Sequence, residues 1–260
     1  MEYSIVVPAH NEASHLDLFV TSFIRRLSGR IDLAELILVE NGSQDATLQQ
    51  CHRLEHKFAG CVRVLSIEKA SYGEAIKRGI LYSRGTHLSI LECDFLDADF
   101  VTDSIDLFLS QNVRFIVASK RHKNSVDQRP LKRRLLTAMY NEVLLHLFLG
   151  YPGTDTHGLK SIEASCAKKL CQLAITSDEI FQTELVLLAW RLGIRIHELP
   201  ITIREMRQAP VAVFRRVPKV VDTIRQLKRS LRRFSDQGAA PALDSLDIAG
   251  VTPPRTSGLL

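Results

Sequence analysis

The sequence predicts a mixed α/β domain in which helices cover both faces of a mostly parallel sheet. Short β-branched runs alternate with longer segments of helical periodicity through the first half of the chain. The runs are almost wholly apolar, as strands are when both of their faces are buried. Strand–helix alternation at this rhythm is typical of parallel sheets. Ligands bind beyond the carboxyl ends of such strands, so the residues after each strand are the first candidates for a site.

Five apolar runs are expected to be strands, at residues 4–7, 36–39, 62–67, 88–91 and 115–118. Four segments between them have helical spacing, at residues 13–27, 44–58, 73–83 and 101–110. For the less regular second half we expect a helix at 131–149, a turn at 150–154, a helix at 178–192, and a strand at 194–203 that Pro200 interrupts. Residues 1–210 should therefore form the main domain. Residues 236–260, rich in Gly, Ala, Pro and Ser, should form a disordered tail.

Composition places the chain among soluble globular proteins. Its 260 residues are 45% hydrophobic and 24% charged, and we find no run of about 18 apolar residues. A strand-like run begins at residue 3, which leaves no room for a signal peptide. The five cysteines include no C-x-x-C pair, as is typical of reduced thiols. We expect a cytoplasmic protein, or one held peripherally at the cytoplasmic face of a membrane.

The positive charge of the chain is concentrated near its end. The net charge is +5, yet residues 214–234 carry eight Arg or Lys against one acid, Asp222. Such a segment points to phosphates on lipid or on nucleic acid. Nucleic acid is not expected, because no nucleic-acid fold motif accompanies the segment. At helical spacing an apolar face separates from the charges, so residues 211–235 should form a basic amphipathic helix on an anionic membrane surface. In the alternative, this apolar face packs on the main domain.

Polar residues follow the expected strands where a site should lie. The sequence P-A-H-N-E (8–12) follows the first strand and E-N-G-S-Q-D (40–45) the second. Each is also consistent with an ordinary turn and helix cap. After the fourth strand, residues 92–99 contain four acids, which a divalent metal with substrate phosphates would accommodate. A solvated loop and a capped helix would account for Asp97 and Asp99, but less well for Glu92 and Asp94.

Together these segments resemble the family-2 glycosyltransferases, and most of all the dolichyl- or polyprenyl-phosphate sugar synthases. V-V-P-A-H-N-E (6–12), E-N-G-S-Q-D-A-T (40–47), G-E-A (73–75) and E-C-D (92–94) follow the order and spacing of V-P-x-x-N-E, D-D-G-S-x-D-x-T, G-x-A and D-A-D. The likeness continues through S-K-R-H (119–122), L-K-R-R-L-L-T (131–137) and D-T-H-G-L-K (155–160), and covers residues 3–207. It implies the GT-A fold and inverting sugar transfer.

The resemblance also implies a donor site. The donor would be a GDP- or UDP-linked sugar, and the cofactor Mg²⁺ or Mn²⁺. Asp94 would hold the metal, and Glu92 would meet the metal or the ribose. The remaining donor-binding positions that it implies are Pro8, Asn11, Glu12, Glu40, Gly42, Gly73 and Arg207.

Two further arginines would bind the acceptor. Arg121 and Arg133 would grip its phosphate, because a guanidinium matches phosphate oxygens in a fork; a solvated basic face is the alternative. A polyprenyl phosphate is the acceptor that the resemblance implies, and these two arginines favour a phosphate there.

The chain departs from the family's pattern at several positions. Glu40-Asn41 replaces Asp-Asp, Glu92 replaces Asp, and Leu159-Lys160 replaces Phe-Arg. Two alternative functions remain open: transfer to a protein, saccharide or small-molecule acceptor, and nucleotide-sugar binding without turnover.

Overall fold

The computed structural model describes residues 2–30, 33–129, 131, 134–135, 146, 148–203 and 217–236, with the backbone only of 33–34, 217–221 and 235–236. Within them the sheet strands are β1 (Tyr3–Ala9), β2 (Leu33–Asn41), β3 (Val62–Ile67), β4 (His87–Ile90), β5 (Phe115–Ser119), β7 (Lys160–Glu163) and β8 (Ile196–Pro200). Two short strands, β6 (Val126–Asp127) and β9 (Thr202–Ile203), pair separately. The helices are α1 (Leu16–Leu27), α2 (Thr47–Lys57), α3 (Tyr72–Tyr82), α4 (Ala98–Ser110), α6 (Ala164–Leu173), α7 (Phe181–Arg191) and α8 (Val217–Asp236).

Strand order defines where a ligand can bind. The seven-stranded sheet has the order β3-β2-β1-β4-β7-β5-β8. β7 runs antiparallel to β4 and β5, while the other neighbouring pairs are parallel. The chain adds β2 and β3 on one side of β1 and then β4 on the other. The carboxyl ends of β1 and β4 therefore flank the point where strand order reverses, the usual ligand site of such sheets.

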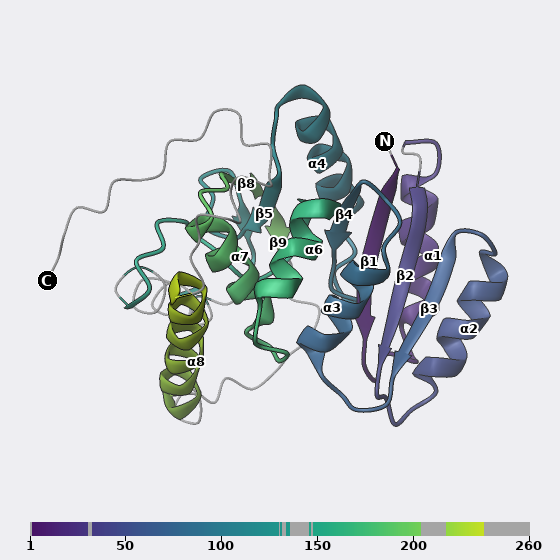
Figure 1. Cartoon of the computed structure of the whole chain (residues 1–260). Coiled ribbons are helices and arrows are strands. Elements are labelled where there is room, and N and C mark those ends of the chain that lie inside the picture. The colour runs from purple at the N-terminus through teal and green to yellow at the C-terminus, as the bar shows by residue number, and fades with distance from the viewer. Residues whose placement is uncertain are drawn as a thin grey trace, which may run out of the picture.

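Helices lie on both faces of the sheet (Figure 1). Ile5 and Val7 pack in a core with residues of α1, α2 and α4. Val6 faces the opposite layer with Ala75 of α3. On that second face, a larger core joins α3, α6, α7 and α8 to β4, β5 and β7. The predicted fold class is thus confirmed: a mostly parallel sheet is covered on both faces.

The five strands expected in the first half are all present. The expected strand at 194–203 is two strands, because the chain leaves the main sheet after Pro200 and pairs Thr202 with Val126 of β6. β7 and α6 were not predicted. Most of the expected helix at 131–149 and all of the tail at 237–260 lie outside the described residues.

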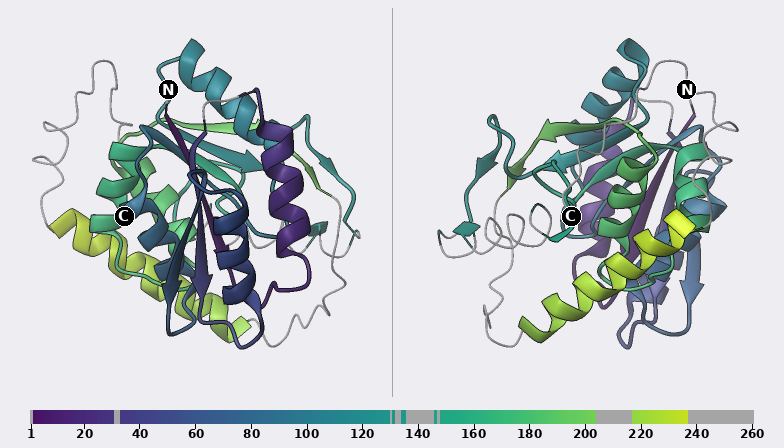
Figure 2. Two further views of the ribbon diagram at one scale, coloured as in Figure 1. Left: turned by 90° about the vertical axis from the view of Figure 1, so that its right-hand side faces the viewer. Right: turned by 60° about the vertical axis from the view of Figure 1, so that its left-hand side comes forward.

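The apolar face of α8 packs on the domain. Leu227, Leu231 and Phe234 are buried in the core that contains α6 and α7, and Figure 2 shows α8 lying along one side of the domain. The sequence left two arrangements for this apolar face, against a membrane or against the main domain. The described residues adopt the second. Among the described residues, no helix is long and apolar enough to cross a membrane. The exposed positions among the described side chains of α8 are all charged: Asp222, Arg225, Lys228, Arg229, Arg232 and Arg233.

Candidate active site

The loops after β1 and β2 are joined by hydrogen bonds into one unit. The Asn11 backbone N–H donates to Ser43 Oγ at 3.1 Å, and Asn11 Oδ1 accepts from the Gln44 backbone at 2.9 Å. His10 donates from Nδ1 to the Asn41 carbonyl oxygen at 2.7 Å. Asn11 has φ +55°, a left-handed conformation that Asn tolerates better than most residues. The helix caps considered as the alternative do not form: α1 begins at Leu16 and α2 at Thr47, and neither N-cap residue makes a side-chain cap hydrogen bond. The polar groups of Asn11 bond instead to the neighbouring loop.

The β2 loop lies against the segment that leads into α3. A Cβ on Gly42, whose φ is +59°, would lie 2.6 Å from the Ala70 backbone nitrogen, so this position requires glycine. Asn41 Oδ1 accepts a hydrogen bond of 2.6 Å from the Ser71 backbone. The carboxyl ends of β1, β2 and β3 thus share one polar edge.

Three of the expected donor-binding residues are buried at this edge. Pro8 lies within β1, and the Glu12 backbone N–H donates to Thr47 Oγ1 at 2.8 Å. Glu40 accepts from the Ser43 backbone at 2.5 Å and from Ser66 Oγ at 2.7 Å. One carboxylate oxygen of Glu40 therefore braces the turn that carries Gly42, and the other bonds to Ser66 of β3. Contact of these three residues with a donor stays a prediction.

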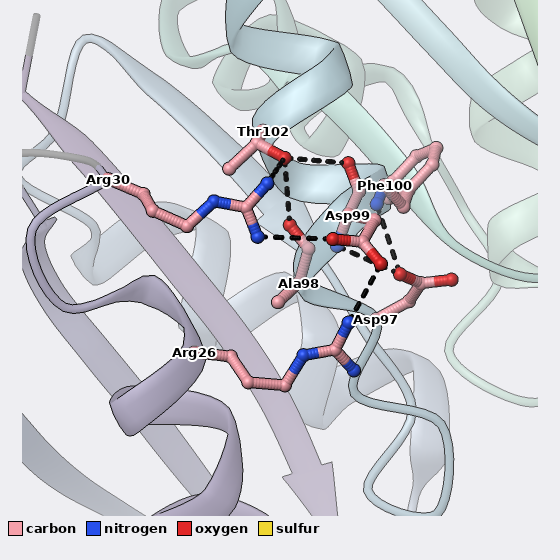
Figure 3. A network of polar contacts seen from close by, with 7 residues as sticks. All are labelled: Arg26, Arg30, Asp97, Ala98, Asp99, Phe100 and Thr102. Atoms are coloured by element: carbon pink, nitrogen blue, oxygen red, sulfur yellow. Dashed lines mark hydrogen bonds and ion pairs between the residues drawn. The ribbon is translucent and has the colours of Figure 1, made fainter.

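Two of the four acids after β4 have structural roles (Figure 3). Asp97 caps α4, accepting from the backbones of Asp99 and Phe100 at 3.0 Å each. Asp99 forms ion pairs with Arg26 at 2.7 Å and with Arg30 at 3.1 Å, which tie α4 to α1. These contacts agree with the capped-helix alternative for this half of the loop.

The other two acids are Glu92 and Asp94, and Glu92 lies near two lysines. Burial raises the pKa of the Glu92 carboxyl, Lys120 and Lys160 lower it, and Asp94 and Asp155 raise it. Each of these charges is thus close enough to act on Glu92. A partly buried carboxylate among like and opposite charges is typical of functional sites.

Lys160 is buried with none of its side chain exposed. Its Nζ donates to the Gly158 carbonyl at 2.9 Å and to Gln182 Oε1. Gln182 in turn donates to Tyr72 Oη at 2.5 Å, which connects β7 to α7 and α3. Burial lowers the pKa of Lys160 to about 7, against the opposing effect of Asp155 and Glu92.

Asp155 completes this cluster from the segment before β7. It is 1% exposed, and its carboxylate accepts from the backbone of His157 at 2.9 Å and of Lys120 at 3.4 Å. The cluster therefore joins the carboxyl end of β5 to the start of β7.

The basic residues assigned to the substrates are only partly described. Arg121 is exposed just after β5, at the same edge of the sheet as Glu92. Arg133 and Arg207 lie outside the described residues.

Gly73, another expected donor-binding position, lies in the first turn of α3 and packs against Ser177. A Cβ at this position would lie 2.5 Å from the Ser177 carbonyl carbon.

The acidic pair fits a divalent cation that substrate phosphates would help to hold. Glu92 and Asp94 offer carboxylate oxygens, the ligands that Mg²⁺ prefers, at the strand-order reversal. Among the described residues, no group of three or more His, Cys, Asp or Glu could hold a metal by itself. Mg²⁺ usually binds through one or two carboxylates plus substrate phosphates, and the donor set here is of that kind.

Comparison with protein families identifies the chain. A family model described as glycosyl transferase family 2 matches residues 4–162, more than half of the sequence. The chain belongs to glycosyl transferase family 2. It is therefore a glycosyltransferase, as the sequence predicted.

Curated relatives extend over most of the transferase. It is 26% identical over 247 residues to a dolichyl-phosphate beta-glucosyltransferase of Saccharomyces cerevisiae, covering 86% of this chain and 72% of the relative. It is 28% identical over 235 residues to the protein of that name from Drosophila melanogaster, covering 82% and 70% respectively.

Solved structures agree on the fold. Glucosyl-3-phosphoglycerate synthase from Mycobacterium tuberculosis, crystallised with UDP, superposes on the transferase with a TM-score of 0.64 at 20% identity. The match covers 88% of this chain and 80% of that one. A complex of the same synthase with Mn²⁺, UDP-glucose and phosphoglyceric acid has a TM-score of 0.62 at 21% identity, covering 91% and 80%. The predicted GT-A fold is thus confirmed.

Several residues of the site were not singled out from the sequence. Asp155 was quoted only as part of the D-T-H-G-L-K motif, and Lys160 was noted besides only as a departure from the family's pattern, although the motif was a usable signal. Tyr72 and Gln182 gave no signal, because only the packing of α3 against α7 brings them to Lys160. His10 lies between named positions and was passed over.

Proposed function

We propose that this glycosyltransferase is metal dependent and inverting, and that it transfers a hexose from a nucleoside diphosphate sugar to a polyprenyl phosphate. The proposal depends on one observation above all: Glu92 and Asp94 follow β4 at the strand-order reversal, and Lys120 and Lys160 lie close enough to act on Glu92. A diphosphate with its cation would meet charges of both signs there.

The chemistry would rest on positioning and charge. A Mg²⁺ or Mn²⁺ ion held by Asp94 and Glu92 would neutralise the departing nucleoside diphosphate. An oxygen of the acceptor phosphate would attack C1 of the sugar as the bond from C1 to the diphosphate oxygen breaks, which inverts C1. Since that phosphate is already ionised, no side chain has to remove a proton.

Lys120, and Lys160 when it is protonated, would add positive charge on the side of the site opposite β1. The buried ammonium of Lys160 also favours the ionised form of Glu92. The loops after β1 and β2 would hold the nucleoside, with Asn11, Glu12 and Glu40 nearest to it.

The acceptor is inferred from charge and from similarity. Arg121 is exposed at the carboxyl end of β5, where a phosphate could approach the donor sugar. The curated relatives are named for dolichyl phosphate, which supports a lipid-linked phosphate. Because those relatives are glucosyltransferases by name, UDP-glucose is the first donor to test.

The basic face of α8 supports a membrane location for the reaction. Five exposed Arg or Lys side chains between residues 225 and 233 face away from the domain core. Because the apolar face is covered, this helix would meet anionic headgroups through charge, with attraction of about 1 kcal/mol per basic residue.

A two-step assay tests the proposed function. First, thermal shift of the whole chain is measured with a panel of UDP- and GDP-sugars, with and without Mn²⁺; we expect one sugar to raise the melting temperature only with the metal. Transfer of that sugar is then measured to polyprenyl phosphate, to phosphoglyceric acid and to water. Transfer to phosphoglyceric acid alone would replace the lipid acceptor by a small molecule. Binding without any transfer would contradict the proposed enzymatic activity.

A further inference from the structure

Glu184 of α7 is a fully buried carboxylate that joins three parts of the chain. It accepts from the backbones of Ile175 and Thr176 at 2.9 Å each, and also from the Thr176 hydroxyl. Its fourth donor is the Ser230 hydroxyl, which is 2% exposed on α8. Hydrogen bonds to a charged group are stronger than neutral ones, and a buried acceptor that loses its donor is destabilised. Ser230 thus helps to hold the segment 175–176 in place.

That segment continues directly into a contact with the start of α3. The Ser177 carbonyl oxygen accepts from Ser71 Oγ at 2.5 Å and from the Glu74 backbone at 3.1 Å. Gly73 permits this approach, because a Cβ there would lie 2.6 Å from Cβ of Phe181. The α6–α7 connection and the first turn of α3 are therefore joined by two hydrogen bonds and by close packing.

The start of α3 is also hydrogen-bonded to the loops that follow β1 and β2. The Ser71 backbone donates to Asn41 Oδ1 at 2.6 Å, and the Asn41 carbonyl accepts from His10. Asn41 immediately precedes Gly42, in the loop that is bonded to Asn11. Contacts therefore continue without a gap from Ser230 on α8 to the loops at the carboxyl ends of β1 and β2.

We propose that Ser230 and Glu184 are positioning residues for the donor site, through which docking of the basic helix α8 holds the loops that bind the nucleotide. Neither residue touches the site itself: Glu184 acts through residues 175–177, and these act through the first turn of α3. The identity of the ligand as a nucleotide rests on the proposed function. The coupling rests only on the contacts described.

The test uses the whole chain with Ser230→Ala. Gln226→Ala is the matched control, because Gln226 lies one turn earlier on α8 and bonds only to Asp222 on the surface in the contacts described. Amide hydrogen exchange is followed at residues 71–76, and the affinity for UDP is measured by calorimetry with MnCl₂ present. We expect Ser230→Ala to speed exchange at 71–76 and to weaken UDP binding at least about fivefold. Gln226→Ala should change neither.

The two readouts separate the possible failures. A lower melting temperature of Ser230→Ala with unchanged exchange at 71–76 and unchanged UDP affinity would show a merely structural role and overturn the inference. If the unmodified chain bound neither UDP nor GDP, the proposed function would fail instead. Exchange at 71–76 would still decide whether α8 is coupled to α3.

Discussion

Lys160 pairs with Ile90 in the antiparallel ladder between β7 and β4. Ile90 lies two residues before Glu92 in the chain. This register sets a buried ammonium near the Glu92 carboxylate that follows β4. A sheet position with no exposed side-chain surface is unusual for lysine, and Lys160 is tolerated there because Gly158 and Gln182 accept its hydrogen bonds.

Lys160 should make the stability of the protein depend on pH. Burial lowers its pKa from the usual 10.5 to about 7 in the folded chain. Between these values the unfolded chain binds a proton that the folded chain does not. Stability therefore rises with pH across this window, by up to about 1.4 kcal/mol per pH unit, and is lost as the pH falls toward 7. We expect the free energy of unfolding of the wild type, minus that of Lys160→Met, to grow from about pH 7 to about pH 9 in urea titrations. Parallel pH profiles would show that Lys160 keeps its charge on folding.

Arg121 should act on the acceptor. Arg121→Ala should raise KM for a polyprenyl phosphate by roughly 10- to 100-fold, because losing a charge-assisted hydrogen bond costs about 1.5–3 kcal/mol. KM for the donor should change far less. Arg53→Ala is the control, since Arg53 is exposed on α2 away from this edge. The same acceptor effect is expected for Arg133→Ala. Normal kinetics with the lipid and weakened donor binding would reverse the assignment.

The exposed basic face of α8 should bind anionic membranes. Neutralising four of its arginines should abolish most co-sedimentation with anionic vesicles and leave neutral vesicles unaffected. Binding of the wild type to anionic vesicles should weaken as salt is added. The fold should survive, because these side chains are exposed. The variant combines Arg225→Gln, Arg229→Gln, Arg232→Gln and Arg233→Gln.

A control with the same net charge separates a specific face from general attraction. It replaces four exposed basic residues on other elements or loops by Gln, and should pellet as the wild type does. Equal loss of binding in both variants would mean that total charge, and no particular surface, attracts the protein. The four positions are Arg25, Arg53, Lys69 and Arg195.

Elements with apolar, periodic sequences could be predicted, and those defined by tertiary pairing could not. Strands such as Val62–Ile67 are marked by β-branched runs. β7 begins with Lys160 and ends with Glu163, and neither charged residue is typical of a central strand. It becomes one because β4 and β5 supply its hydrogen bonds on both sides.

The site could be predicted in outline because its residues follow strands. The division of the acidic loop into Asp97 and Asp99 on one hand and Glu92 and Asp94 on the other was also visible in the spacing. The partner of Asp99 was not, since Arg26 and Arg30 are about 70 residues away in the chain. Likewise, no local pattern links Ser230 to Glu184.

The central claim is that Asp94 binds the metal that holds the donor. Asp94→Asn keeps the size of the side chain and removes its charge. Asp97→Asn makes the same change three residues away, and Asn still caps a helix well. Mn²⁺-dependent binding of the preferred nucleotide sugar should be measured by calorimetry for the wild type and both variants. We expect Asp94→Asn to abolish the Mn²⁺-dependent part, with Asp97→Asn close to wild type. Undiminished Mn²⁺-dependent binding by Asp94→Asn would remove this carboxylate from the mechanism.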